Sequence, residues 1–121
     1  MIFIDSFIYS GMKNILGEEN SYASYPDNFN TFPLGVYSVE ENSQRDRTLD
    51  NEEISSNISF RIDIWDKVES DLIFEKIEKL NEYFTKTYNF KRTFCQQVPD
   101  IDELTHYVIR FSGIVDINSF K

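Results

Sequence analysis

The chain contains few of the side chains that usually carry out catalysis or hold metal ions. Among its 121 residues there is one histidine, His106, and one cysteine, Cys95. Nucleophilic triads and most metal sites use imidazole as the base or as a ligand. His106 falls inside an expected strand, where we expect a structural or solvent-exposed role, and Cys95 has the setting of an unreactive strand thiol. A single cysteine also excludes an internal disulfide and a multi-thiolate metal site.

Carboxylates are the remaining groups that could do chemistry, either as an acid–base pair or as oxygen ligands of a cation. Their densest cluster is Asp100, Asp102 and Glu103. This cluster lacks the glycine-containing spacing of an EF-hand loop, and the four glycines of the chain form neither a GxGxxG nor a Walker-type motif. The sequence therefore predicts no catalytic residue, no cofactor and no metal ligand, and a protein that is not an enzyme.

The net charge bears on the choice of partner. Twelve Lys and Arg against 21 Asp and Glu give the chain a formal charge of −9. Binding to a phosphate backbone needs clustered Lys and Arg that displace counterions, and the chain has no basic run. We expect no tight binding to nucleic acid. An acidic surface either keeps the protein soluble or keeps passing DNA from adhering to it.

Length and hydropathy indicate one soluble domain over 1–121. A chain of this size buries roughly two-thirds of the surface that its unfolded form exposes. With 11 Phe, 7 Tyr and 1 Trp, its core should be rich in aromatic rings. No stretch approaches the ~20 apolar residues of a membrane span, and 1–16 lacks the basic-then-apolar order of a signal peptide. We expect a protein made in a cytoplasm, without membrane contact.

The first half of the chain predicts one helix and one strand. Apolar residues at steps of three and four over 2–16 indicate a helix, which Gly17 should end. Residues 18–33 read as an irregular segment held by aromatic rings, and 34–40 as a strand. The polar stretch 41–53 reads either as a long loop or arm, a length that is usually functional or disordered within a compact domain, or as a solvated hairpin tip.

The clearest strand of the sequence is 58–65, where Ile and Phe alternate with polar residues at the period of two expected of a half-buried strand. Asp66, followed three residues later by Glu69, resembles a capping box and predicts that a helix starts there. The apolar face of that helix continues to about residue 87.

Two more strands complete the pattern, at 89–96 and 105–115, and 116–121 reads as a frayed tail. The predicted order is helix, strand, strand, helix, strand, strand. Such an order predicts an α+β domain, with a mainly antiparallel four-stranded sheet and two helices packed on one of its faces.

Surplus aromatic and arginine side chains make association with protein the best remaining function. Phe32 belongs to a group of rings between residues 22 and 32 that exceeds what a minimal core needs. Arg45, Arg47 and Leu49 are the residues of the 41–53 segment that would seek a partner. Tyr, Phe and Arg anchor many protein interfaces, so we name Arg45, Arg47, Leu49 and Phe32 as candidate interface residues.

The last two-thirds of the chain resembles a known family. The run Asn57-Ile-Ser-Phe-Arg-Ile-Asp-Ile-Trp-Asp66, the acidic helix after it and Phe90-Lys-Arg-Thr-Phe94 are similar to the tail-completion or tail-terminator proteins of long-tailed phages. The closing His106-Tyr-Val-Ile-Arg-Phe-Ser-Gly113 resembles the last strand of that family, and Pro33–Glu41 its strand before a variable loop. The resemblance covers about 33–115.

This resemblance implies a non-enzymatic virion protein at the junction of head and tail, made in the host cytoplasm. Such proteins form a ring, usually six-fold, that stops polymerisation of the tail tube and joins it to the head. The implied partners are further copies of the chain, the tail tube protein and a head-completion or connector protein. DNA would pass through the ring without specific binding. Closed cyclic symmetry requires one patch to meet a different patch on the next copy.

Two departures from the family pattern leave alternatives open. The family commonly has a basic residue after the last-strand histidine, where this chain has Tyr107, and the 96–104 turn also differs. A related head–tail neck or connector subunit is therefore one alternative. An acidic inhibitor that occupies a basic site on a host protein is another, because −9 suits it. A small hydrolase would need a base and a nucleophile that the sequence does not show.

Overall fold

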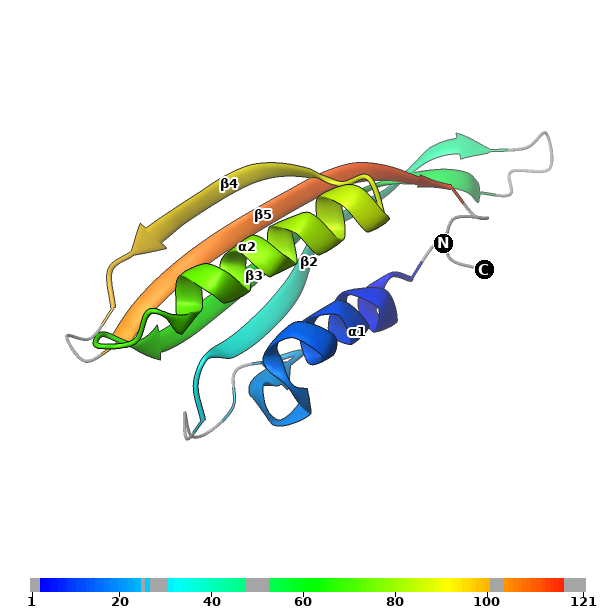
Figure 1. The fold of residues 1–121 in the computed structure, drawn as a ribbon. Coiled ribbons are helices and arrows are strands. Elements are labelled where there is room, and N and C mark those ends of the chain that lie inside the picture. The colour runs from blue at the N-terminus through cyan, green and yellow to red at the C-terminus, as the bar shows by residue number, and fades with distance from the viewer. Residues whose placement is uncertain (1–2, 25, 27–30, 48–52, 101–103, 117–121) are drawn as a thin grey trace.

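The computed structural model describes residues 3–24, 26, 31–47, 53–100 and 104–116, and the statements below concern these residues. The protein is an α+β domain with two helices and a five-stranded mixed sheet, so the predicted class is confirmed (Figure 1). The elements in chain order are α1 (Asp5–Leu16), β1 (Ser21–Tyr22), β2 (Leu34–Arg47), β3 (Glu53–Lys67), α2 (Leu72–Glu82), β4 (Lys91–Val98) and β5 (Leu104–Asp116).

The sheet has the order β1-β2-β3-β5-β4, and every pairing is antiparallel except that of β1 with β2. The sequence predicted four antiparallel strands, and β1 is the strand that it missed. Ser21 and Tyr22 pair with Gly35 and Val36 at one end of β2. A two-residue strand carries no periodic pattern, so only the tertiary pairing reveals it.

The first helix follows the predicted apolar spacing. Ile4, Ile8, Met12 and Leu16 are buried along one stripe of α1, which begins at Asp5. Gly17 ends the helix with a φ of 99°, and its N–H donates to the carbonyl of Lys13 at 3.0 Å. A positive φ of this size costs glycine little because it has no Cβ. The predicted helix and its stop signal are confirmed.

Of the predictions for 41–53, the loop is wrong wherever the structure describes the segment, and the alternative of a hairpin fits it. Glu41–Arg47 continue β2, and β3 already begins at Glu53. The two strands pair as a hairpin up to Arg47 and Glu53, with a register shift between Val39 and Glu41. The sequence of this segment is polar at nearly every position, so backbone pairing forms these strands without the apolar alternation that usually marks a strand. Residues 48–52 lie outside the described part.

The predicted start of the second helix is also wrong. β3 continues through Asp66 to Lys67 because its pairing with β5 extends to Leu104. The carboxylate of Asp66 accepts the N–H of Lys67 at 2.8 Å, and α2 starts only at Leu72. The helix then passes into a π-helical turn, Tyr83–Thr87, so its C-terminal limit agrees with the prediction. Asp116 closes β5, and the rest of the predicted frayed tail, 117–121, lies outside the described residues.

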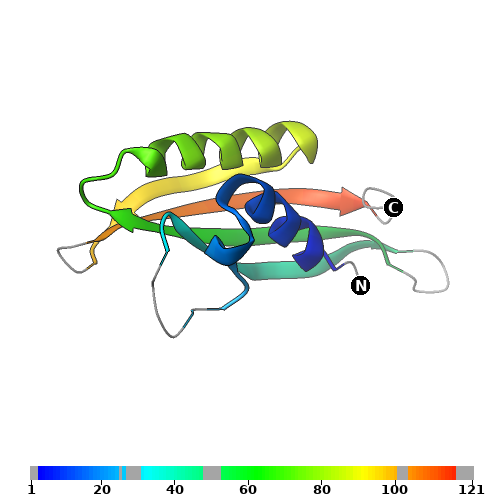
Figure 2. The same cartoon turned by 60° about the horizontal axis from the view of Figure 1, so that its bottom comes forward.

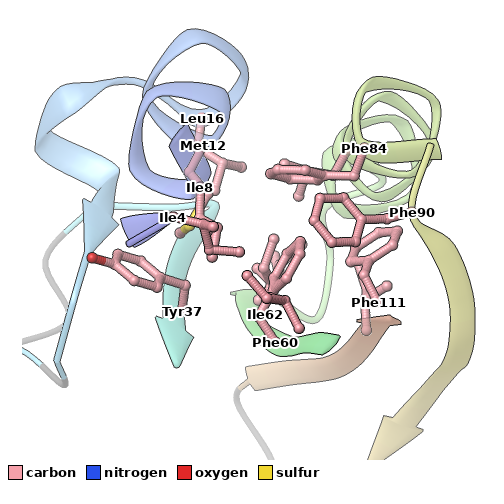
Figure 3. Packing of buried hydrophobic residues seen from close by; sticks show 14 of the residues in the cluster. Ile4, Ile8, Met12, Leu16, Tyr37, Phe60, Ile62, Phe84, Phe90 and Phe111 are labelled. Atoms are coloured by element: carbon pink, nitrogen blue, oxygen red, sulfur yellow. The ribbon is translucent and has the colours of Figure 1, made fainter. Parts of the chain in front are cut away.

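Both helices cover the same face of the sheet, and the other face carries none (Figure 2). The core between helices and sheet is centred on Phe60, whose ring lies 5.0 Å from that of Phe84, 5.1 Å from that of Phe90 and 5.3 Å from that of Phe111 (Figure 3). Edge-to-face and offset ring pairs of this kind add stability beyond the area they bury. The aromatic core that the composition predicted is confirmed.

Candidate functional site

The face of the sheet without helices, here called the open face, contains most of the polar side chains that contact one another across strands. Its residues, drawn from β2, β3, β4 and β5, include Glu40, Glu41, Ser59, Arg61, Asp63, Trp65, Phe94, His106, Arg110 and Ser112. The strand alternation that buries every second side chain under the helices places these residues on the opposite side. Any site on this face is therefore built on rigid strands.

The only histidine lies in the middle of a polar cluster on this face. His106 Nε2 is 3.0 Å from Asp63 Oδ2, and its Nδ1 is 3.1 Å from Asp100 Oδ2. The imidazole stacks on the indole of Trp65 with 4.2 Å between ring centroids, and Trp65 Nε1 donates to Asp100 Oδ2 at 2.9 Å. Arg61 pairs with the other oxygen of Asp63 at 2.8 Å. We call these five residues the His106 cluster.

The geometry of the His106 cluster suits a structural link and not a catalytic base. Both ring nitrogens of His106 face a carboxylate oxygen of the same chain, so neither points towards a space that a substrate could occupy. The side chains of His106 and Asp63 are also only 12% and 6% exposed. The cluster ties β3, β5 and the segment before β5 into one unit.

Sequence reasoning placed His106 in a strand but missed its partners. Asp63 and Asp100 stand 43 and 6 positions away in the chain, and no motif spacing joins the three. One usable signal was Asp63 itself, a carboxylate within the clearest strand, which the structure buries to 4% exposure. Burying a charged group is costly unless it is paired, so a carboxylate in such a strand indicates a cation opposite it.

A small apolar cluster lies beside the His106 cluster on the open face. Leu34, Val36 and Trp65 form its centre, and Tyr22, Phe32 and Leu104 pack around it. Phe32, one of the four candidate interface residues, is therefore half-buried within its own chain. Its partly exposed ring stays a candidate for contact with another chain.

Further along the open face the carboxylates are paired as well. Arg110 Nε lies 3.1 Å from Glu40 Oε1, and its guanidinium stands 5.0 Å from the centre of the Phe94 ring. Ser59 Oγ lies 3.2 Å from Ser112 Oγ and donates to Glu41 at 3.4 Å. These contacts link β2, β3, β5 and β4 in one line across the sheet.

Two of the remaining candidate interface residues, Arg45 and Arg47, lie toward the far end of the β2–β3 hairpin. Arg45 is exposed on β2, and Arg47 is the last residue of that strand. The side chain of Arg47 and the whole of Leu49 lie outside the described residues. The structure thus brings the two arginines together on a strand near the hairpin tip, apart from Phe32 at the other end of β2. Their role as interface residues stays a prediction.

Exposed apolar side chains gather at two opposite ends of the molecule. Val68, Leu72 and Phe74 surround the junction of β3 and α2, and the Phe74 ring packs edge-on against Tyr107 with 5.8 Å between centroids. Phe3 precedes α1 and Ile114 lies near the end of β5, at the opposite end (Figure 1). Single exposed apolar residues are common on monomers, so these positions mark possible contact areas without defining one.

Cys95 has the surroundings of an unreactive thiol. It is half-buried on β4 against the helix-covered core. Burial raises the pKa of this thiol, and the positive charge of Arg92 opposes that shift only in part. Because the thiolate is the reactive form, a raised pKa keeps the group inert at neutral pH.

Neither a family model nor any curated protein matches this sequence. In the part of the chain that the structure describes, no group of three or more His, Cys, Asp or Glu side chains is placed to hold a metal ion. Within the same residues, neither helix has the length and apolar character needed to cross a membrane.

Proposed function

We propose that the protein is a structural subunit that assembles with copies of itself into a closed ring. Its role would be that of the tail-completion proteins that it resembles: to cap a tail tube, stop its polymerisation and join it to the head. The observation that carries the proposal is a strand extension whose β2–β3 hairpin projects beyond both helices (Figure 1).

This extension is formed by the distal parts of β2, β3 and β5, and we call it the ribbon (Asn42–Arg47, Glu53–Asn57 and Gly113–Asp116). β4 pairs with β5 only as far as Ser112, and β1 pairs with β2 only at Gly35 and Val36. Beyond those points the three strands continue side by side, and the hairpin projects past both helices (Figure 1). Strands with unpaired edges are ready to pair with another chain.

The open face also bears on the choice between a ring subunit and an acidic inhibitor. An inhibitor that mimics nucleic acid needs carboxylates that are available to a basic partner. On this face Glu40 pairs with Arg110, and Asp63 pairs with Arg61 and His106. On α2, Lys79 lies 2.9 Å from Glu75. Carboxylates with cations of their own chain favour the structural subunit.

A ribbon-shortened variant tests this proposal. Replacing 44–56 by Asn-Gly joins Ser43 to Asn57, which pair directly in the hairpin, through a two-residue turn of the kind that such strands accept. We expect the unaltered protein to form closed rings in negative-stain electron microscopy and the shortened variant to sediment as a folded monomer. A shortened variant that forms the same rings would show that the ribbon has no part in assembly.

A further inference from the structure

The outer edges of β2 and β4 each include a stretch that no other described strand covers. Beyond Val36, no described strand pairs with the outer edge of β2 over Tyr37–Glu41. On the opposite side of the sheet, β4 pairs with β5 alone, so its outer edge is unpaired from Lys91 to Val98. Each edge presents backbone donors and acceptors that another strand can use.

Over the stretches Tyr37–Glu41 and Lys91–Cys95, the two edges carry opposite charges. Glu40 and Glu41 are exposed on β2, whereas Lys91 and Arg92 are exposed on β4. Within the described part of the chain, Lys91 and Arg92 form no ion pair. Like charges placed opposite each other destabilise a strand pair, and opposite charges stabilise it. Pairing of β2 with β2, or of β4 with β4, is therefore disfavoured, and pairing of β2 with β4 is favoured.

The charges also lie at the same level of the sheet. Lys91 is opposite Ser112, Ser112 is opposite Ser59, and Ser59 is opposite Glu41, so one row of residues joins the two edges. The Ser59 hydroxyl contacts both Ser112 and Glu41, which places the row on the open face. If a second copy stands beside the first without a shift along the strands, its Glu41 faces Lys91.

The strand directions are compatible with such a contact. Because each neighbour from β2 to β4 is antiparallel, β2 and β5 run one way while β3 and β4 run the other. Rotation about an axis parallel to the strands preserves these directions. The β2 strand of the next copy in a ring therefore runs antiparallel to β4, which is the more stable arrangement of a strand pair.

We propose that the β4 edge of each copy pairs with the β2 edge of the next, with Lys91 opposite Glu41, and that this contact and the adjoining ribbon are both needed to close the ring. The inference rests on the proposed function and identifies the partner surfaces for it. The pairing covers Lys91–Cys95 against Tyr37–Glu41, because β1 occupies the following positions of β2. It is a heterologous contact, as a closed ring requires.

Cysteine cross-linking tests the contact in the full chain. In a Cys95→Ala background, we introduce Glu41→Cys and Lys91→Cys together. Within one chain these positions are three strand spacings apart, about 14 Å, whereas a disulfide needs Cα atoms within about 7 Å. Any disulfide must therefore join two copies. We expect mild oxidation to give a ladder of linked chains that ends at the number of copies in the ring.

The matched control replaces Lys91 by another exposed lysine. Glu41→Cys with Lys79→Cys, in the same background, places the second cysteine on the exposed side of α2. We expect no ladder from this variant. If the protein assembles but no disulfide forms between positions 41 and 91, the proposed contact is wrong. The ring would then be held by other surfaces, and these edges would be available to a strand of another protein. A protein that stays monomeric contradicts both the contact and the proposed function.

Charge reversal provides an independent test that folding defects cannot mimic. Glu41→Lys alone and Lys91→Glu alone each place like charges at the contact, and we expect each to weaken assembly about tenfold. An equimolar mixture of the two variants restores an opposite pair at every contact of an alternating ring. Assembly of the mixture near the unaltered level supports the proposal, and failure to recover contradicts it.

Discussion

The two faces of the sheet are built on different physical principles. The helix-covered face is apolar, and its largest side chains, among them Phe60, Phe84 and Phe111, are at most 1% exposed. Among the described residues, the open face has only the small apolar cluster around Leu34, and most of it is held by pairs of polar groups such as the His106 cluster and the Glu40–Arg110 pair. The covered face excludes water, whereas the open face pairs its charged groups with one another in contact with water.

This difference suggests that the covered face provides most of the stability, and that the open face and the sheet edges are available for recognition. Burial of apolar area is the dominant favourable term in folding, so the covered face should account for most of the stability of the fold. Net contributions of hydrogen bonds and exposed ion pairs are about 1 kcal/mol or less. The open face and the sheet edges can therefore change with little effect on the fold, and we look for function there.

The largest expected effect comes from removing the aromatic side chain of Phe60, at the centre of the core. Phe60→Ala removes contacts with three other rings and leaves a cavity, so we expect a destabilisation of about 3–5 kcal/mol. Urea unfolding followed by circular dichroism measures it. Ser59→Ala, the next residue on the open face, is the control and should cost less than about 1 kcal/mol. Equal costs for the two would break the distinction between the faces.

A smaller effect on the covered face concerns Gly11. A Cβ there would lie 2.9 Å from Tyr83 Cδ1 and 3.0 Å from Phe84 Cζ, so α1 approaches the π-helical turn too closely for alanine. Helix propensity alone would make Gly11→Ala stabilising by up to about 1 kcal/mol. We expect a net destabilisation of about 1–3 kcal/mol from overpacking. A higher midpoint of thermal unfolding would show instead that the two elements can separate at this point.

On the open face, the largest expected effect is that of His106→Ala. The substitution removes one partner each from Asp63 and Asp100 and the stack on Trp65, and should destabilise the fold by about 1–2 kcal/mol. Lys79→Ala breaks the exposed pair with Glu75 and is the control, with no measurable change expected in the urea midpoint. If both variants unfold at the same urea concentration, the His106 cluster is no stronger than a surface ion pair.

The smallest expected effect depends on pH. Burial, and next the hydrogen bond with Tyr88, raises the pKa of Tyr83 to about 12. The unfolded chain ionises this group near the usual value of about 10, so the stability it contributes is complete below pH ~10 and is lost as pH rises towards ~12. Over that pH range, we expect the free energy of unfolding of Tyr83→Phe to fall by on the order of 1 kcal/mol less than that of the unaltered protein. If the two proteins lose stability equally between about pH 10 and about pH 12, groups other than Tyr83 cause the alkaline loss.

The parts of the fold that the sequence predicted are those whose period matches a buried stripe. Ile4, Ile8 and Met12 mark α1, and the alternation around Phe60 marks β3, because one face of each element must be apolar to pack. The β2 part of the ribbon, Asn42–Arg47, has no such stripe, since it is polar and depends on its neighbours for pairing. The capping pattern at Asp66 failed because pairing with β5 continued the strand past it.

The candidate site was less predictable than the fold. The partners of His106 lie on other elements, and the level that Lys91 shares with Glu41 depends on three strand registers at once. A single sequence gives the residues of an edge but neither the order of strands nor their register. The opposite charges of the two edges could be seen in the sequence, but their alignment could not.

The central claim is that this chain assembles with itself. Native mass spectrometry of the purified protein over a concentration series tests it most directly. The account predicts one discrete closed oligomer, a hexamer first of all, that appears with rising concentration and is reduced in the Glu41→Lys variant. A strict monomer at every concentration would contradict the account.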